Sequence, residues 1–293
     1  MIDLLVVGDC NPDLILAGGD VVPEFGQTEK LVDDARLLVG GSAAIAACGA
    51  ARLGLSVALV AAVGDDLFGR FMLEQLAARR VDVSACPAEP DWETGLTVAL
   101  VRGGDRAMLT APGAIPALAA RHVPDRLLAG TRHLHVASYF LLDGLRDAVP
   151  SLVETAHAAG ATVSLDPQGD PSGRWDAGLP ALAASLDVLF VNEQEHGMLA
   201  ASGSPLTVVK RGARGATALA GDERVDAAPP AVNVVDATGA GDSFDAGFIA
   251  GRLRGLGLAE SLALACACGA MATRALGGTA AQPTFDEALA AVR

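Results

Sequence analysis

The stretch DATGAGDSF, residues 236–244, decides the expected fold. Its Gly-Ala-Gly core at 239–241 leads into a sequence with the length and composition of a helix that ends near Gly255. Glycine-rich turns at helix starts expose backbone N–H groups, which bind anions without any net positive charge. Asp242 follows this turn directly, and it has two interpretations: it caps the free amides of the helix, or it is a general base beside an anion hole.

Outward from this stretch, short runs rich in Val, Leu and Ile alternate with Ala-rich stretches of helical length. This alternation is typical of βαβ units around a mainly parallel sheet. Strands are predicted at 3–8, 56–63, 132–137, 161–166, 187–191, 206–210 and 216–220. Helices are predicted near 42–53, 66–80, 145–159, 179–185, 193–202, 242–254, 258–275 and 284–292.

Two segments break this alternation. Residues 13–39 alternate apolar and polar side chains without a helical pattern, and residues 93–110 predict a hairpin around Gly103-Gly104. Both suit a small β structure that closes as a lid over a ligand at the carboxyl ends of the strands. Because no linker or repeat divides the chain, we expect one domain over residues 1–293 with these two lid segments inserted.

Composition and charge exclude several classes of partner. The 293 residues are 51% hydrophobic and carry a formal net charge of −14, which would repel nucleic acid and anionic membranes. Any bound phosphate must therefore be held locally, by amides, a metal ion or a few basic side chains. Five scattered cysteines and an N-terminus without the features of a secretory signal indicate a cytoplasmic protein. His133 and His135 form an HxH pair, but without an evident third ligand we interpret them as structural.

Other nucleotide-binding motifs are missing from the sequence. No GxxxxGK[ST] occurs, and no GxGxxG opens a helix after the first predicted strand, so a Walker-type NTPase and a conventional Rossmann dehydrogenase lose their main support. A second glycine pair, Gly40-Gly41, precedes a helix of small side chains. It either lets that helix pack tightly or lets the backbone approach a ligand.

Together these patterns resemble the PfkB, or ribokinase-like, carbohydrate kinase family. The C-terminal signature of the family, D-T-x-G-A-G-D-x-F, is matched from Asp236 to Phe244, with Ala237 as a normal variation before Thr238. The N-terminal signature is matched by the second glycine pair, its helix and VGDDLFG at 63–69. The resemblance covers nearly the whole chain. It implies a ribokinase-like three-layer α/β/α fold with a mainly parallel central sheet and a small β lid.

The resemblance also implies roles for individual residues. Asp242 would be the base that takes the proton from a primary hydroxyl, beside an anion hole for the transferring phosphoryl group formed by Gly239, Ala240 and Gly241. The acceptor would be bound by Asn11, Asp13, Gly40, Gly41 and Ser42, and the nucleotide by Asn192, Lys210, Gly212 and Gly278. Glu195 would hold magnesium indirectly, and Asp236 would serve a monovalent cation.

The implied activity is an ATP- and Mg2+-dependent kinase, with potassium as a further activator, that acts on a small sugar, sugar acid or nucleoside. Ile45 stands where sugar-binding members commonly carry asparagine, and it would put an apolar wall in place of a hydroxyl partner. This departure argues against an ordinary ribokinase or fructokinase. Two alternatives stay open, a catalytically inactive binding protein of the same fold and a vitamin kinase for a pyridoxal-like alcohol. The exposed β lid also predicts a homodimer.

Overall fold

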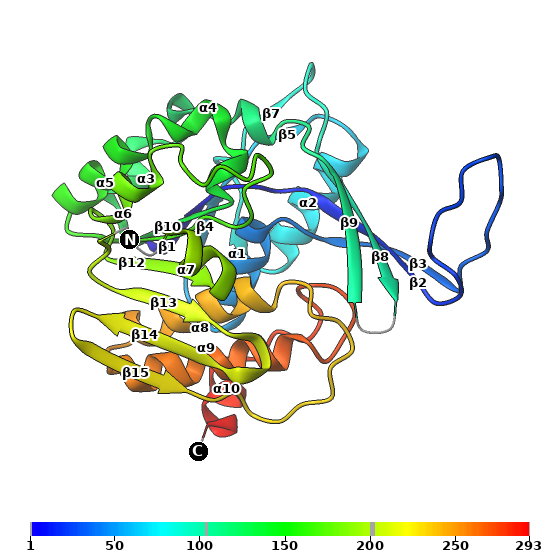
Figure 1. The fold of residues 1–293 in the computed structure, drawn as a ribbon. Helices are drawn as coiled ribbons and strands as arrows, with labels where there is room; N and C mark the ends of the chain where they lie inside the picture. The colour runs from blue at the N-terminus through cyan, green and yellow to red at the C-terminus, as the bar shows by residue number, and fades with distance from the viewer. Residues whose placement is uncertain (1, 103–104, 200–202, 293) are drawn as a thin grey trace.

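The computed structural model describes residues 2–102, 105–199 and 203–292. Within these ranges the largest sheet has nine strands, in the order β15-β14-β13-β12-β11-β10-β1-β4-β6 (Figure 1). All neighbours in this sheet are parallel except the two pairs that involve β14. The strands are β1 (Ile2–Val7), β4 (Val57–Val60), β6 (Val81–Asp82), β10 (Thr131–Ala137), β11 (Thr162–Asp166), β12 (Val188–Asn192), β13 (Thr207–Lys210), β14 (Ala216–Ala220) and β15 (Glu223–Ala227).

Helices cover both faces of this sheet, because its central strands are apolar on both sides. In β1, Leu4 and Val6 enter one hydrophobic core while Leu5 and Val7 enter the other. The first core contains α1 (Ser42–Arg52), α2 (Leu67–Ala78), α8 (Ala240–Leu253), α9 (Leu258–Ala272) and α10 (Phe285–Ala291). The second contains α3 (Asp125–Ala129), α4 (Asp143–Arg146), α5 (Val149–Ala158), α6 (Leu179–Ala183) and α7 (Glu193–Leu199). The expected three-layer arrangement is confirmed.

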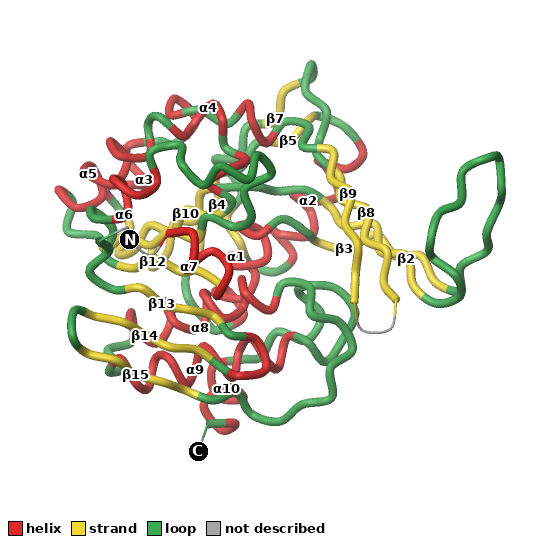
Figure 2. Tube along the Cα trace, viewed as in Figure 1, coloured by secondary structure: helices red, strands yellow, loops and turns green. Residues whose placement is uncertain are grey.

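A smaller sheet projects from one side of the molecule (Figures 1 and 2). Its strands are ordered β3-β2-β8-β9, and the β8–β9 hairpin is the one that the sequence predicts. The turn expected at Gly103-Gly104 lies outside the described residues. Asp13, Thr97 and Thr110 are direct register partners, so they lie on the same face of this small sheet. That face lines a cavity between the small sheet and the nine-stranded sheet. The strands are β2 (Pro12–Ala17), β3 (Asp34–Val39), β8 (Leu96–Arg102) and β9 (Asp105–Ala111).

The boundaries differ from the predictions in a few places. The single helix expected at 145–159 is interrupted between α4 and α5, and Pro150 stands in the first turn of α5, where a missing N–H costs nothing. The strand expected at 56–63 is divided into β4 and β5 (Val63–Gly64), which pairs with β7 (Ala88–Glu89). The last residues of the helix expected at 193–202 lie outside the described ranges.

The HxH pair on β10 is buried and structural, as predicted. His133 shares hydrogen bonds with Thr162 at 2.6 Å and Ser164 at 2.7 Å, and His135 bonds Ser164 at 2.8 Å. Burial lowers the pKa of His133 to about 3 and that of His135 to about 4. Both imidazoles are therefore neutral near pH 7. Separately, no helix in the described part of the chain is long and apolar enough to cross a membrane.

Candidate active site

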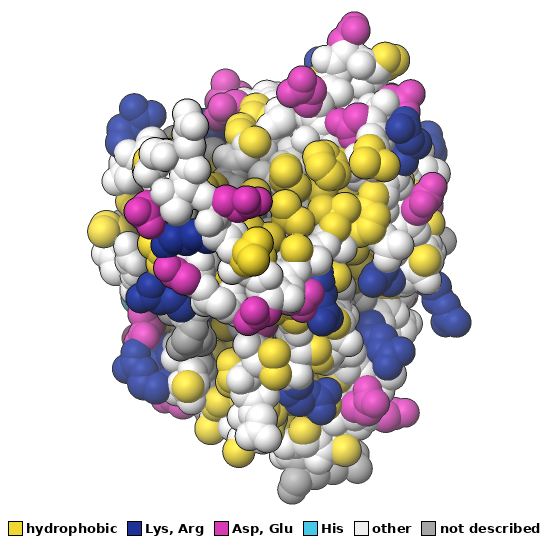
Figure 3. All heavy atoms as spheres, turned by 90° about the vertical axis from the view of Figure 1, so that its right-hand side faces the viewer, with side chains coloured by type: hydrophobic (Ala, Val, Ile, Leu, Met, Phe, Trp, Pro, Cys, Tyr) yellow, Lys and Arg dark blue, Asp and Glu magenta, His cyan; other side chains and the backbone are white. Residues whose placement is uncertain are grey.

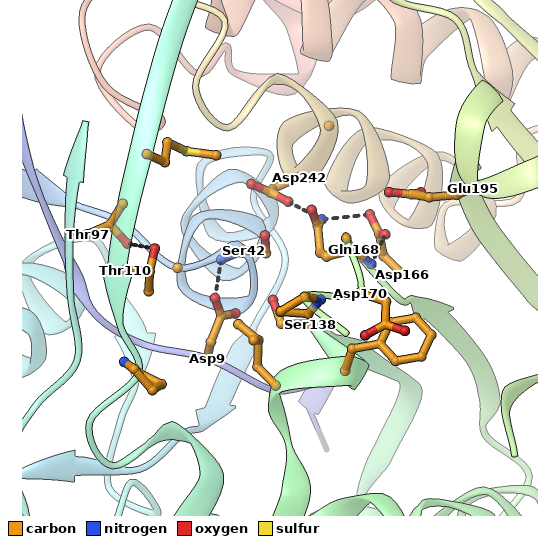
Figure 4. A pocket seen from close by; sticks show the side chains of 18 of the residues that line it. Asp9, Ser42, Thr97, Thr110, Ser138, Asp166, Gln168, Asp170, Glu195 and Asp242 are labelled. Atoms are coloured by element: carbon orange, nitrogen blue, oxygen red, sulfur yellow. Dashed lines mark hydrogen bonds between the residues drawn. The ribbon is translucent and has the colours of Figure 1, made fainter. Parts of the chain in front are cut away.

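A cavity of about 1020 Å³ lies where the parallel strands end and the lid begins (Figure 4). Asp166, Asn192 and Lys210 are the last residues of β11, β12 and β13, so the sheet delivers all three to the same edge. The predicted residues that line the cavity are Asn11, Asp13, Gly41, Ser42, Asn192, Glu195, Lys210, Gly212, Gly239, Gly241 and Asp242. Gly40, Ala240, Gly278 and Asp236 pack directly behind this wall.

The N-terminus of α8 forms the most constrained part of the wall. Gly239 is its N-cap with φ of 69°, a left-handed conformation that favours glycine. A methyl group on Gly239 would lie 2.6 Å from the Gly278 Cα atom, so the position has no room for a side chain. The Ala240 N–H already donates to the Ala237 carbonyl at 3.3 Å. Since the first amides of a helix have no intrahelical acceptor, the N–H groups of Gly241 and Asp242 are the ones left for an anion.

Asp242 is buried in the first turn of this helix, at the cavity wall. Burial and the nearby negative charge of Asp166 raise its pKa to about 7, while Lys210 and a hydrogen bond from Ser42 act in the opposite direction. A carboxylate that titrates near neutral pH suits general base catalysis, because it is ionised often enough to act and basic enough to accept a proton.

A buried ion pair lies next to Asp242. Lys210 Nζ is 2.5 Å from Asp166 Oδ2 and 3.2 Å from Asp245 Oδ2. Although burial opposes the charge on Lys210, the two carboxylates raise its pKa. Burial raises the pKa of Asp245 well above its usual range, whereas Lys210 outweighs burial at Asp166 and lowers its pKa. Lys210, which the resemblance places at the nucleotide phosphates, is thus bound by two carboxylates. Its ammonium group also lies close to the turn before α8, since a methyl group on Gly241 would lie 3.3 Å from its Nζ.

Asn192 and Glu195 bind each other at the end of β12. The Asn192 backbone N–H and side-chain Nδ2 donate to the two Glu195 oxygens at 2.8 and 2.6 Å, and Asn192 Oδ1 accepts from the Glu195 N–H at 2.9 Å. Mg2+ is usually bound through one or two carboxylates, water and substrate phosphates, so a single buried carboxylate at the cavity wall fits it. Among the described residues, no group of three or more His, Cys, Asp or Glu side chains forms a closed metal cage.

Asp236 connects the loop before α8 to the loop after α9. One carboxylate oxygen accepts from the Thr238 backbone N–H at 2.9 Å and from the Thr238 hydroxyl at 2.8 Å. The other accepts from the Gly277 N–H at 2.8 Å. Both carboxylate oxygens of Asp236 already accept hydrogen bonds. This arrangement suits a residue that links the two loops better than one that binds a cation directly.

Asn11 and Asp13, the residues expected to bind an acceptor, line the cavity beside the lid. Asn11, just before β2, donates from Nδ2 to Thr97 Oγ1 at 3.0 Å. Thr97 is in turn 3.0 Å from Thr110 Oγ1, as Figure 4 shows, so a hydrogen-bonded chain runs from this segment across β8 to β9. Burial, with the charge of Asp9 as a second cause, raises the pKa of Asp13 to about 7. A methyl group on Gly40 would lie 2.1 Å from Asp13 Oδ1, so this glycine makes room for the Asp13 carboxylate.

Ile45 borders the cavity, but its side chain packs against Gly239 in the turn before α8 and against Gly278. A methyl group on Gly278 would lie 2.5 Å from Ile45 Cδ1, and one on Gly239 would lie 2.9 Å from Ile45 Cγ2. Ile45 therefore supports the turn before α8, a role that its place in the sequence did not indicate.

Several other side chains reach the cavity without a signal in the sequence. Asp9 caps α1 from outside the helix, since its oxygens accept from the N–H groups of Ser42 at 3.0 Å and Ala43 at 2.9 Å. Arg106 on β9 extends from the lid to Thr238, 3.4 Å away. Long-range convergence of this kind leaves no local pattern. Further lining residues that the sequence did not single out include Ser138, Phe140, Arg146 and Gln168.

A three-layer fold with a carboxylate at a glycine-rich helix start, beneath a β lid, is the arrangement that the resemblance to carbohydrate kinases predicts. The sequence matches the description "pfkB family carbohydrate kinase" over residues 1–284. The chain belongs to this family, and it is a sugar kinase.

Named relatives span nearly the full length of the chain. An ATP-dependent ribose-1-phosphate kinase from Halopiger xanaduensis is 33% identical, over 98% of this chain and 96% of its own. A fructokinase from Klebsiella pneumoniae is 34% identical, over 85% and 90%. Among solved structures, the adenosine kinase from Sinorhizobium meliloti superposes with a TM-score of 0.87 at 25% identity, covering 99% of this chain and 98% of its own. A crystal structure described as "a putative Ribokinase II in complex with ATP and Mg+2 from E.coli" has a TM-score of 0.86 at 25% identity, covering 100% of this chain and 99% of its own.

Proposed function

We propose that this protein transfers the γ-phosphoryl group of ATP to a primary hydroxyl of a small sugar, sugar acid or nucleoside, with Asp242 as the base. The observation that carries the proposal is the place of Asp242: buried at the cavity wall, in the first turn of α8, next to a turn whose geometry only glycine adopts without strain. The E. coli neighbour that holds ATP and Mg2+ supports the choice of phosphoryl donor.

The reaction follows from this arrangement. Asp242 accepts the proton of the acceptor hydroxyl, whose oxygen then attacks the γ-phosphorus while the bond to the β-phosphate oxygen breaks. The N–H groups of Gly241 and Asp242 stabilise the negative charge on the transferring group. The lid, which reaches the same cavity through Thr97, Thr110 and Arg106, excludes water and so limits hydrolysis of ATP.

Magnesium would be held at the Asn192–Glu195 pair, through water and the phosphates of the nucleotide. When bound, it would neutralise charge on the phosphate oxygens. Gly212, Gly278 and Lys210 are proposed to shape the nucleotide end, with Lys210 acting through its ion pair. Potassium, where it activates, would be bound by backbone carbonyl oxygens of the loops that Asp236 keeps together.

The acceptor would be bound between the end of β1 and the lid strand β2. Asn11 and Asp13 offer hydrogen-bond partners to its hydroxyls, and Gly41 and Ser42 lie beside them at the start of α1. Phe140 and Met108 supply apolar surface across the cavity. Such a site fits a polyol whose hydroxyls bind the polar residues on one side, while its less polar side contacts the apolar residues.

The test is a screen of pentoses, hexoses, sugar acids and nucleosides with ATP and Mg2+, in which ADP release is measured alongside thermal stability. We expect acceptor-dependent ADP release with at least one class. Stabilisation by ATP and an acceptor without any ADP release would instead favour the inactive binding protein. A response only to pyridoxal-like alcohols would favour the vitamin kinase.

We also propose a homodimer through the lid, formed by the face of its sheet that points away from the cavity. Leu37, Leu14, Val98 and Leu109 are register partners across the four strands, so they form one apolar row on that face. Leu109 is 65% exposed, and Figure 3 shows hydrophobic side chains gathered on the side that bears the lid. A second copy is the occupant that fits, because this row carries no charge and is complementary to itself.

The dimer is tested by analytical ultracentrifugation of a Leu14→Asp, Val98→Asp double variant. The wild type should sediment as a dimer and the double variant as a monomer. Met198→Asp, at a position on α7 that is 58% exposed and away from the lid, is the matched control and should remain dimeric. A monomeric wild type would contradict the proposal.

A further inference from the structure

Gln168 lies in the loop after β11 and joins the base to the buried ion pair. Its Nε2 donates to Asp242 Oδ1 at 3.1 Å and to Asp166 Oδ2 at 3.0 Å, as Figure 4 shows. Its backbone N–H donates to Asp166 Oδ1 at 3.1 Å. Its φ of 57° falls in the left-handed region, which a residue with a side chain rarely adopts. A strained conformation persists only where its surroundings hold it, and strained residues are common at active sites.

Asp166 gives Gln168 a rigid anchor. Its side chain is 2% exposed, and the same Oδ2 that accepts from Gln168 is 2.5 Å from Lys210 Nζ. Lys210 is fixed in turn by Asp245, which lies one turn along α8 from Asp242. Moving Asp166 would break a buried ion pair and leave an uncompensated charge, which is costly. Gln168 is therefore fixed by Asp166 through both its backbone N–H and its side-chain amide, and the same amide reaches the proposed base, Asp242.

We propose that Gln168 is a positioning residue for the base. By binding Asp242 through Oδ1, it fixes the rotation of the carboxylate and leaves Oδ2 for the proton of the acceptor. An amide that donates to a carboxylate stabilises its ionised form, so Gln168 also keeps the base ready to accept that proton. The inference rests on the proposed role of Asp242, but the contact itself can be tested without turnover.

The kinetic test is Gln168→Met, which removes both donated bonds and nearly keeps the side-chain length. We expect kcat to fall roughly 10- to 100-fold, the size of a lost hydrogen bond to a charged group, while the KM values for ATP and acceptor stay within about twofold. Gln75→Met on α2 is the matched control. It also removes a side-chain hydrogen bond, the one that Gln75 accepts from Arg79, but at a position far from the cavity. Its kcat should equal that of the wild type.

The second test follows the Asp242 carboxyl carbon by NMR titration of the free protein, with the signal identified by its loss in Asp242→Asn. The midpoint should rise by roughly one pH unit in Gln168→Met and stay unchanged in Gln75→Met. Gln168→Asn, whose amide is too short to reach both carboxylates, should behave like Gln168→Met and serves if that variant does not fold. An unchanged midpoint, or a kcat within threefold of the wild type, overturns the proposal. If the wild type transfers no phosphoryl group at all, the proposed function fails instead, and the titration still decides the role of Gln168.

Discussion

The two ends of the cavity are built in different ways. The proposed phosphoryl-transfer end comes from one contiguous stretch, the turn at 236–239 and the first turn of α8, and it offers backbone amides and one carboxylate. The proposed acceptor end is assembled from the segment after β1, the start of α1 and three lid strands, β2, β8 and β9. Its hydrogen bond between Asn11 and Thr97 joins residues that are 86 positions apart.

On the proposed roles, this difference accounts for the different acceptors in the names of relatives such as the ribose-1-phosphate kinase and the fructokinase. Backbone amides at a helix start depend on glycines and on chain geometry, so this end tolerates little change. Side chains that converge from distant segments can be replaced one at a time without disturbing the chemistry. Changes at the first end should therefore lower kcat, and changes at the second should alter acceptor binding.

The largest predicted effect is at the phosphoryl-transfer end. Gly239→Ala should lower kcat by about 100-fold or more, because its methyl group would meet Gly278 and displace the turn that aims the amides. The acceptor KM should change little. Steady-state kinetics with varied ATP and acceptor would measure both.

Gly255→Ala is the control for this prediction. Gly255 follows the other end of α8 with φ of 84°, and a methyl group there would meet nothing within 4 Å. It should cost about 1 kcal/mol of stability and leave kcat unchanged. Equal losses of turnover in both variants would show that α8 stability, rather than turn geometry, governs catalysis.

A smaller effect is predicted at the acceptor end. Asp13→Asn should raise the acceptor KM about tenfold with little change in kcat, because a carboxylate that accepts from a hydroxyl is lost. Since the pKa of Asp13 is raised to about 7, the carboxylate is ionised above that pH, and wild-type acceptor binding should strengthen as pH rises through 7. The variant should lack this dependence of KM. Asp34→Asn, at the far end of β3, should keep it.

The smallest effect separates two roles for Ile45. Ile45→Val removes Cδ1, the atom that packs against Gly278, and should cost about 1 kcal/mol of stability and lower kcat a few-fold. The acceptor KM should not change. Ile249→Val, in the buried part of α8, should cost the same stability without the loss of turnover. A changed acceptor preference in Ile45→Val would restore the role predicted from the sequence, an apolar wall of the acceptor site.

The contiguous features of the molecule could be predicted from the sequence, and the convergent ones could not. Strand and helix periodicity indicated βαβ units around a mainly parallel sheet, and the Gly-Ala-Gly stretch indicated the start of α8, whose first turn contains Asp242. The interrupted helix at Pro150 and the short strand β15 were not expected, because local patterns do not show where tertiary packing ends an element. Arg106 reaches the site only through the fold, whereas Gln168 lies two residues after the predicted strand end at 166, which places it near the ligand edge but does not indicate its contact with Asp242.

The most direct test of the central claim is the pH dependence of kcat for the wild type and Asp242→Asn, measured with an acceptor found in the screen. Asparagine keeps the size of the side chain but cannot accept the proton. We predict a wild-type kcat that falls as pH decreases below about 7, where the carboxyl group becomes protonated, and an Asp242→Asn kcat lower by about 10²- to 10⁴-fold without that pH limb. An Asp242→Asn variant with near-normal turnover and an unaltered pH profile would contradict the assignment of Asp242 as the base.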